Sequence, residues 1–272
     1  MRKNLLIVVA LFLATSLSAQ LYVGGKLGYG FGAQKSDLGV LMTDDAESIV
    51  WGSVGQGFAP GLKVGYFFND NLGFELGINY FLGAKQTIAD VTLTMAPSMI
   101  YTNQATAQSK QMRLLPQLVY RSDMGIYGRF GIVMPIGGST IAHQEEYSPG
   151  ANPVTTVSEV EFKGDFTIGF AGAFGYEFEL SDNLGLFGEL EYIGLNIRRN
   201  TSTVTMYEVN GTDMLPALTT SQKETVYLDE LTSTSNTSSN PNFDPAKATD
   251  DLKSTSGYST LRINFGVVYH FN

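Results

Sequence analysis

The most regularly spaced charged residues lie in segments whose apolar residues occupy every second position. Successive side chains of a β-strand point to opposite faces, so these charges share the face opposite the apolar row. Six are basic and five are acidic: Lys26, Lys63, Glu75, Arg113, Arg121, Arg129, Glu177, Glu179, Glu189, Glu191 and Arg262. If this face is enclosed, the charges form either a selective pore or a paired plug. At matching heights on adjacent strands we expect the pairs Lys63–Glu75, Arg129–Glu177 and Glu191–Arg262.

Two histidines are the other groups suited to acid–base chemistry. His143 lies near Ser139, Glu145 and Glu146, from which a Ser/His/acid arrangement could be drawn, and His270 is far away in the sequence. Three common residue types in a polar segment are a weak signal for catalysis. We therefore predict no catalytic residue and no enzyme activity. Without cysteine, and with separated histidines, we also predict no metal site and no cofactor.

Pairs of acidic residues recur in the polar segments, at Asp44-Asp45, Glu145-Glu146, Asp229-Glu230 and Asp250-Asp251. They could collect divalent cations or contact lipopolysaccharide through them. The twelve-residue spacing of a calcium-binding loop is absent from the sequence. We favour a solvated, repulsive surface.

Residues 1–19 have the pattern of a secretory signal peptide, which leaves residues 20–272 as one exported domain. Arg2 and Lys3 precede an apolar run that is too short to be a membrane anchor, and cleavage is expected after Ala19, with Ser18 as the alternative. Removing Arg2 and Lys3 from the 17 basic residues leaves 15 against 26 acidic ones, a net charge of −11. Such a chain has no general attraction for nucleic acid.

Eight alternating segments follow in the mature chain, at about residues 21–34, 58–68, 72–82, 112–120, 126–136, 166–180, 184–192 and 261–272. Three-residue turns alternate with long polar insertions at about residues 34–56, 83–110, 137–164 and 198–257. The alternation predicts short turns at one rim of a sheet and long loops at the other. Four stretches within the insertions keep β character, 87–94, 154–162, 203–209 and 224–228, whereas 232–242 is expected to be disordered.

Two architectures fit amphipathic strands of this kind. A small secreted soluble barrel would bury the apolar face, whereas an outer-membrane barrel exposes it to lipid and encloses the charges. The signal peptide, the rim asymmetry, strands near the spanning length of about 9–11 residues and aromatics at strand ends favour the membrane barrel. An eight-stranded barrel has an interior that side chains can fill, so we favour a plug of salt bridges over a pore.

The whole mature chain resembles the small outer-membrane β-barrel family, the OmpA-like and OmpX-like transmembrane domains of Gram-negative bacteria. The Ser-Ala-Gln processing region and the Val-Tyr-His-Phe-Asn ending resemble Bacteroidota members in particular. The resemblance implies an all-β, eight-stranded antiparallel up-and-down barrel with periplasmic turns and extracellular loops. It also implies that the barrel-assembly machinery reads the last strand through Phe265, Val267, Tyr269 and Phe271. Asn272 is one residue more than the usual ending, and no peptidoglycan-binding domain follows, so tethering to the cell wall is not expected.

The function implied by this resemblance is structural or interactive, in the cell envelope of the outer membrane. Lipid and lipopolysaccharide would surround the barrel, and the loops could bind an extracellular protein or glycan. A narrow porin-like channel is the alternative, and a lipid A-modifying barrel enzyme using His143 is a further one.

Overall fold

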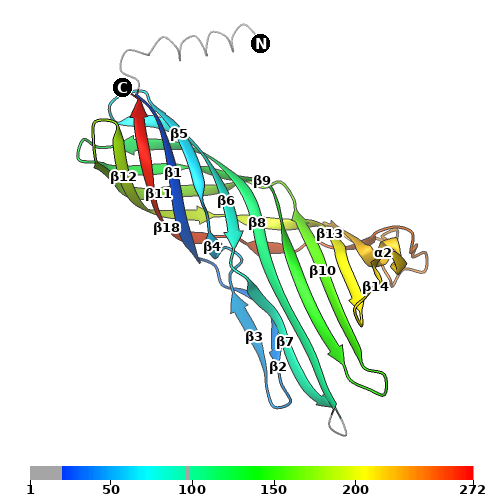
Figure 1. Cartoon of the computed structure of the whole chain (residues 1–272). Helices are drawn as coiled ribbons and strands as arrows, with labels where there is room; N and C mark the ends of the chain where they lie inside the picture. Colours follow the sequence, from blue (N-terminus) through cyan, green and yellow to red (C-terminus); the bar gives the residue numbers. More distant parts are fainter. Residues whose placement is uncertain (1–19, 96–98, 272) are drawn as a thin grey trace.

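The computed structural model describes residues 20–95 and 99–271, which form an almost entirely β structure (Figure 1). The predicted signal peptide lies outside these residues. The strands are β1 Gln20–Gly32, β2 Ser36–Met42, β3 Glu47–Gly52, β4 Gly57–Phe58, β5 Gly61–Phe67, β6 Leu72–Gly83, β7 Gln86–Met95, β8 Met99–Arg121, β9 Ile126–Ser148, β10 Val154–Gly164, β11 Gly169–Glu179, β12 Leu184–Gly194, β13 Asn196–Val209, β14 Thr212–Asp213, β15 Glu224–Leu228, β16 Thr249–Leu252, β17 Thr255–Gly257 and β18 Thr260–Phe271. Single turns of helix occur at η1 Leu215–Ala217 and α2 Thr220–Lys223. Within the described part of the chain, no helix has the length and apolarity needed to cross a membrane.

Part of the sheet pairs in a closed circuit, which we call the closed sheet. The pairing runs from β1 through β5, β6, β8, β9, β11 and β12 to β18, which pairs again with β1, always antiparallel. β4 extends the line of β5, and the two are separated by Ala59 and Pro60. Leu21 lies opposite Phe271, so β1 and β18 lie side by side in Figure 1. In a circuit of this kind every strand has a neighbouring strand on both sides, so the sheet has no edge strand.

Short turns join β5 to β6, β8 to β9 and β11 to β12, all at the end of the closed sheet where β18 finishes (Figure 1). In the first turn, the Asn69 Oδ1 accepts hydrogen bonds from the backbone N–H groups of Asn71 (3.0 Å) and Leu72 (2.8 Å). An asparagine side chain that bonds the following backbone in this way favours a tight reversal of the chain. The predicted rim of short turns is present.

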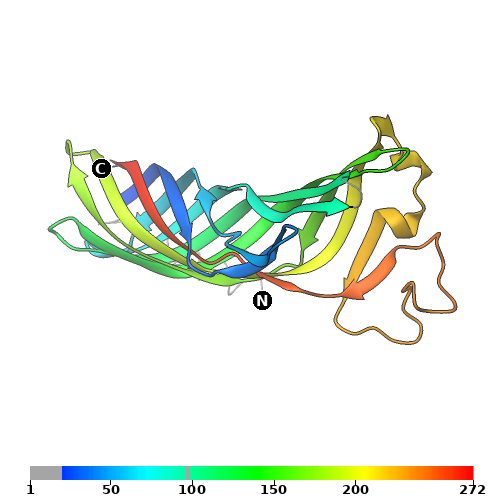
Figure 2. The ribbon, with the colours of Figure 1, turned by 90° about the horizontal axis from the view of Figure 1, so that it is seen from below.

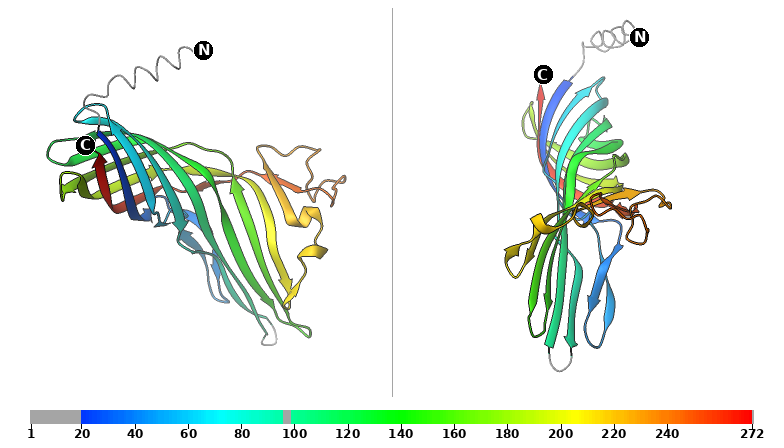
Figure 3. Two further views of the ribbon diagram at one scale, coloured as in Figure 1. Left: turned by 45° about the horizontal axis from the view of Figure 1, so that its top comes forward. Right: turned by 90° about the vertical axis from the view of Figure 1, so that its right-hand side faces the viewer.

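At its opposite end the closed sheet continues into a long projection, which we call the extension (Figures 2 and 3). β8 and β9 have 23 residues each, about 76 Å at 3.3 Å per residue, and pair through both the closed sheet and the extension. β7 pairs with β8, and β2 pairs with β3 and, in parallel, with β7. On the other side β10 lies between β9 and β13, and β13 also pairs with β15.

The insertions are therefore more ordered than the sequence indicates. The stretches with β character are strands β7, β10, β13 and β15, as predicted, and β2 and β3 are additional. Residues 232–242, expected to be disordered, contain no strand but form a hydrogen-bonded loop. Asn240 Nδ2 donates to the backbone carbonyls of Ser233 (2.7 Å) and Ser235 (2.9 Å). Polar side chains that bond nearby backbone groups order this loop without a hydrophobic core, and composition alone does not reveal such bonds.

The closed sheet exposes its apolar residues and buries its charged ones. Phe265 is 67% exposed, while Arg262, three residues away on the same strand, is fully buried. The predicted assembly-signal residues all lie in this exposed row: Phe265, Val267, Tyr269 and Phe271. A soluble protein would have the opposite arrangement, because exposing so much apolar surface to water is unfavourable.

Candidate functional site

Acidic and basic side chains contact one another inside the closed sheet, midway between the short turns and the extension. Arg129, from β9, donates hydrogen bonds to both Glu75 on β6 and Glu189 on β12. Glu75 Oε2 also lies 3.3 Å from Lys63 Nζ and accepts a 2.9 Å hydrogen bond from the Tyr22 hydroxyl. The Lys63–Glu75 pair predicted from strand heights is present. Every one of these side chains is buried.

A second group of bonds joins β12, β18 and β1. Glu191 lies opposite Arg262 and Glu189 opposite Asn264 in the strand register. Arg262 Nη1 donates to Glu191 Oε2 at 3.0 Å, which is the predicted pair. Lys26 Nζ bridges Glu189 (3.2 Å) and Glu191 (2.9 Å). We call the connected residues the central ionic network: Lys26, Lys63, Glu75, Arg129, Glu189, Glu191 and Arg262.

Two apolar clusters enclose the central ionic network. The cluster nearer the extension contains Phe81, Leu115, Val133, Ile193, Leu195 and Tyr258. The cluster nearer the short turns consists of Tyr22, Phe67, Val119, Tyr127, Phe187 and Val268. Side chains from many strands thus fill the interior at three levels, which is the expected packing in a narrow circuit of strands.

The predicted pair Arg129–Glu177 is wrong. Arg129 lies opposite Ala173, four residues from Glu177, or about 13 Å along the strand. Glu177 instead contacts His270 Nε2 at 2.7 Å and Arg121 Nη1 at 3.3 Å, near the short turns. The number of residues between a charge and the short turn does not predict its partner here, because strands in a closed sheet are tilted and staggered relative to one another.

Glu179 does not belong to the buried charges. It is exposed at the end of β11, next to the short turn that precedes β12. The near balance of charge inferred from the sequence included Glu177 and Glu179, whereas neither lies in the central ionic network. The sequence pattern gives the face of a strand on which a residue lies, but it does not show whether that part of the face is enclosed.

Arg113 gives the buried interior a surplus of positive charge. Its Nε donates to Gln111 Oε1 at 3.0 Å, and its guanidinium lies 4.1 Å from the centre of the Phe81 ring. Both Nη atoms of Arg113 lack a hydrogen-bond partner among the described residues, and no described carboxylate pairs with it. Arg113 and the central ionic network together hold five bases and three carboxylates, and the other buried carboxylate, Glu177, pairs with His270 and Arg121 near the short turns. Sequence reasoning placed Arg113 on the correct face but did not show that it lacks a partner.

The arrangement of Ser139, His143 and acid does not form. Ser139 and His143 both belong to β9, four residues apart, which puts their Cα atoms about 13 Å apart. His143 Nδ1 instead lies 3.3 Å from Glu159 Oε1 on β10. Glu146 Oε1 accepts a 3.1 Å hydrogen bond from the Tyr101 hydroxyl. The absence of an enzyme activity stays a prediction.

Several of the paired acidic residues have structural partners in the extension. Asp44 Oδ1 accepts a hydrogen bond from the backbone N–H of Thr94 at 2.6 Å, and Asp250 Oδ2 accepts one from Asn236 at 2.7 Å. The hydrogen bond from Arg198 lowers the pKa of Asp229 from its ordinary value. The described residues contain no group of three or more histidine or acidic side chains arranged to hold a metal ion.

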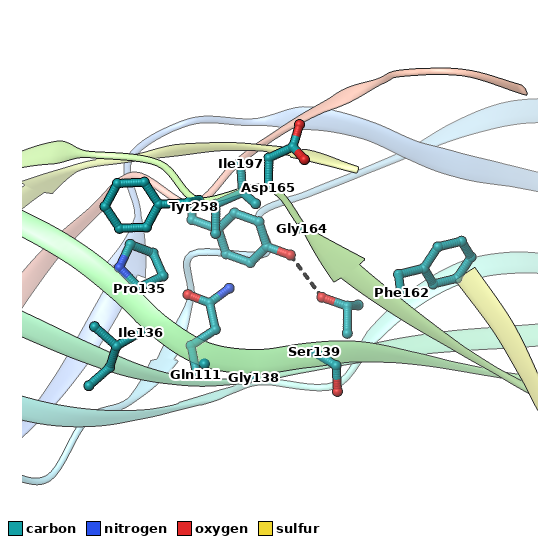
Figure 4. Close-up of a pocket in the computed structure, with 13 residues that line it drawn as sticks. Gln111, Pro135, Ile136, Gly138, Ser139, Phe162, Gly164, Asp165, Ile197 and Tyr258 are labelled. Atoms are coloured by element: carbon teal, nitrogen blue, oxygen red, sulfur yellow. Dashed lines mark hydrogen bonds between the residues drawn. The ribbon is translucent and has the colours of Figure 1, made fainter. Parts of the chain in front are cut away.

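A cavity of about 440 Å³ lies where the closed sheet gives way to the extension (Figure 4). Its lining includes Gln111, Pro135, Ile136, Ser139, Asp165 and Tyr258. Residues 135–139 of β9 form one side, and residues 164–166, at the end of β10 and just after it, form the other. Sequence reasoning missed this site. The available signal was Pro135 followed by Gly137 and Gly138 at the end of an alternating segment.

An apolar exterior around an enclosed charged interior is the construction of outer-membrane β-barrels. The chain belongs to the outer membrane protein beta-barrel domain family, whose model matches residues 5–271. The assignment to an outer-membrane β-barrel family made from the sequence is confirmed, while the likeness to OmpX-like and Bacteroidota members stays a prediction. The comparison with curated protein sequences finds no match.

The chain is also similar to solved outer-membrane protein structures. OprG from Pseudomonas aeruginosa is 13% identical, with a TM-score of 0.46 and coverage of 94% of this chain and 97% of OprG. Neisserial surface protein A is 9% identical, with a TM-score of 0.32 and coverage of 93% and 97%. CarO2 from Acinetobacter baumannii is 13% identical, with a TM-score of 0.34 and coverage of 93% and 99%.

Proposed function

We propose that this protein is an eight-stranded transmembrane barrel of the bacterial outer membrane with a closed interior. Its role is to anchor the extension at the cell surface, where the extension binds a protein or glycan partner. The observation that carries the proposal is the enclosed ionic network between two apolar clusters. Outer-membrane lipid and lipopolysaccharide surround the closed sheet, and the assembly machinery reads β18 during insertion.

The dimensions of the closed sheet support a membrane-spanning role. β18 has 12 residues and β11 and β12 have 11 each, close to the 9–11 residues with which a tilted strand crosses a bilayer. Apolar residues in the exposed rows suit contact with hydrocarbon, and the closed circuit pairs the backbone groups of neighbouring strands, apart from one side of residues 134–139 in β9. The rim with short turns then faces the periplasm.

The extension supports a role in surface contacts. β3 pairs with β2 on one side and has no partner on the other among the described strands. Ile49 and Trp51 on this edge strand are exposed. An exposed strand edge with apolar side chains can accept an added strand from another chain.

Purified protein in planar lipid bilayers should show no stable conductance, because an ion would have to displace both apolar clusters and the ionic network. If a current appears, the Glu191→Gln variant, which removes one buried carboxylate, tests whether that current passes through the interior of the closed sheet. A stable wild-type conductance whose ion selectivity changes in Glu191→Gln would contradict the closed interior and indicate a channel.

Single introduced cysteines test the orientation, since the chain contains none. Gly150 lies in the turn between β9 and β10, where an added Cβ meets no atom within 4 Å, and Asp182 is exposed in the turn between β11 and β12. In intact cells, a membrane-impermeant maleimide should label Gly150→Cys, and it should label Asp182→Cys only after the outer membrane is opened. Labelling of Asp182→Cys in intact cells, with Gly150→Cys unlabelled, would reverse the orientation.

A further inference from the structure

The wall of the closed sheet has a break on one side of β9. Val133 pairs with Gly169 of β11, and Thr140 pairs with Phe162 of β10. Between these points, residues 134–139, apart from the bulged Ile136, pair with β8 but have no strand partner on their other side in the described chain. The opposite segment, residues 165–168, turns toward β13, where the Asp165 N–H donates to the Arg198 carbonyl at 2.8 Å.

The sequence of β9 favours this break. Pro135 has no N–H and is tolerated where a strand does not need a full ladder of hydrogen bonds. Gly138 has a φ of 122°, and a Cβ there would lie 2.1 Å from the Lys110 carbonyl oxygen, so this position requires glycine. The register between β8 and β9 shifts at Met112/Arg113, next to these residues. The break is therefore a specific feature of this chain.

The break lies at the end of the apolar exterior that is nearer the extension. On β8 the exposed row ends with Met112, and the next outward residue is Lys110. Ile136 and Phe166, on the two sides of the break, are 53% and 72% exposed. These two apolar side chains stand where hydrocarbon gives way to the polar surface of a bilayer.

The cavity behind these apolar residues has a mixed lining, in which polar groups lie beside apolar side chains such as Phe162 and Ile197. Figure 4 shows Gln111 and Tyr258 among the residues that line it, and the Tyr258 hydroxyl lies 2.8 Å from Thr140 Oγ1. Its one charged lining residue within the described chain is Asp165, which lies 2.7 Å from Lys253 Nζ. A second cavity of about 350 Å³ shares Thr140 and Tyr258 with it and continues into the extension. Both volumes fall within the range of ligand-binding cavities.

We propose that this cavity binds an amphipathic molecule from the bilayer, with an uncharged head that carries hydroxyl or amide groups and an alkyl chain. The head occupies the cavity, and the alkyl chain leaves between Ile136 and Phe166 into the lipid. Two observations select this chemistry. The open edge of β9 needs hydrogen-bonding partners, which hydrocarbon cannot supply. The ion pair of Asp165 leaves no unpaired charge among the lining residues to attract a charged head.

The route of the ligand is lateral. Tyr258 and Leu195 belong to the apolar cluster that closes the interior below the cavity. A bound molecule therefore exchanges with the bilayer and does not descend through the ionic network. This inference rests on the proposed transmembrane orientation and adds a binding site to it.

The test uses a monoacylglycerol with a photoreactive diazirine on its alkyl chain, incorporated with the full protein into lipid nanodiscs. After illumination, peptide mass spectrometry should find labelling concentrated in residues 134–139 and 164–168. Excess unlabelled monoacylglycerol should abolish this labelling but not the weak labelling along the lipid-facing rows. Heat-modifiable gel migration verifies that each sample is folded.

Gly137→Trp obstructs the open mouth of the cavity, since Gly137 lines the cavity and an added Cβ there meets no atom within 4 Å. It should reduce the labelling about tenfold or more, a loss of about 1.4 kcal/mol of binding. Gly150→Trp, at an equally open position in a distant turn, is the matched control and should leave labelling unchanged. If Gly137→Trp does not fold, Phe166→Asp at the exposed side of the break replaces it, with the same expectation.

Uniform labelling of the lipid-facing rows, without competition at the cavity, would overturn the binding site and leave the transmembrane orientation intact. Equal labelling of Gly137→Trp and Gly150→Trp would overturn it as well. An absence of labelling on the lipid-facing rows themselves would instead contradict the orientation on which the site depends.

Discussion

Replacing Glu189 by glutamine should lower the free energy of unfolding by about 3–5 kcal/mol, the cost of leaving buried charges without their partner. Glu189 accepts hydrogen bonds from Arg129, from Asn264 at 2.7 Å and from Tyr127 at 2.7 Å, and it lies 3.2 Å from Lys26. The glutamine has the same shape, so the loss is one of charge. Loss of this negative charge increases the excess of buried bases over buried carboxylates in the interior of the closed sheet. Urea titration in lipid vesicles, with the folded fraction read from heat-modifiable gel migration, measures the change.

Arg113→Met is the matched control for this prediction. Arg113 is as deeply buried as Glu189, but its Nη atoms have no partner in the described part of the chain. Removing it reduces the positive surplus and should leave the free energy of unfolding unchanged or increase it. The double variant should recover part of the stability lost in Glu189→Gln, because the two charges interact. Equal losses in the two single variants would contradict a surplus of buried positive charge.

Phe265→Arg should destabilise the protein by about 2–4 kcal/mol in lipid vesicles, the cost of a lipid-facing arginine near the bilayer midplane. Phe265 is 67% exposed and stands midway along the outward row from Leu261 to Phe271. In water, the same exposed position would tolerate an arginine. The free energy of unfolding in vesicles, from urea titration of the refolded protein, gives the value.

Phe271→Arg at the end of the same row is the control for depth. At the bilayer interface the cost falls to about 0–1 kcal/mol, so the difference between the two variants reports the position of the membrane. Refolding into vesicles contains no assembly machinery, so this comparison is independent of any signal in β18. Similar costs at both positions would argue against a membrane around the closed sheet.

The alternation of residue types predicted the strands of the closed sheet well. In β18 the row from Leu261 to Phe271 lies outside and Arg262 lies inside, because a side-chain period of two is a local property of an extended backbone. Two of the three predicted ion pairs also form, since Glu191–Arg262 and Lys63–Glu75 join neighbouring strands. The family followed from the same pattern and from the C-terminal strand.

Other features depended on the relative stagger of strands. Arg129 reaches Glu75 and Glu189 and does not reach Glu177, because the pairing of β9 with β11 places it opposite Ala173. The polar insertions fold into the extension because β8 and β9 continue past the closed sheet and provide edges for β7 and β10. Hydrogen-bonded edges, which arise only after folding, give these polar segments their structure.

The sequence by itself determined which face of each strand is apolar, where the chain reverses in short turns, and the family to which the chain belongs. These properties depend on residues close together in the chain. For residues 20–95 and 99–271, the tertiary structure alone decided that Arg113 is buried without a carboxylate, that Glu179 lies outside the ionic network, and that β9 is open between Val133 and Thr140. Each of these depends on which residues of distant strands are brought to the same height, and the closure of the sheet sets that height.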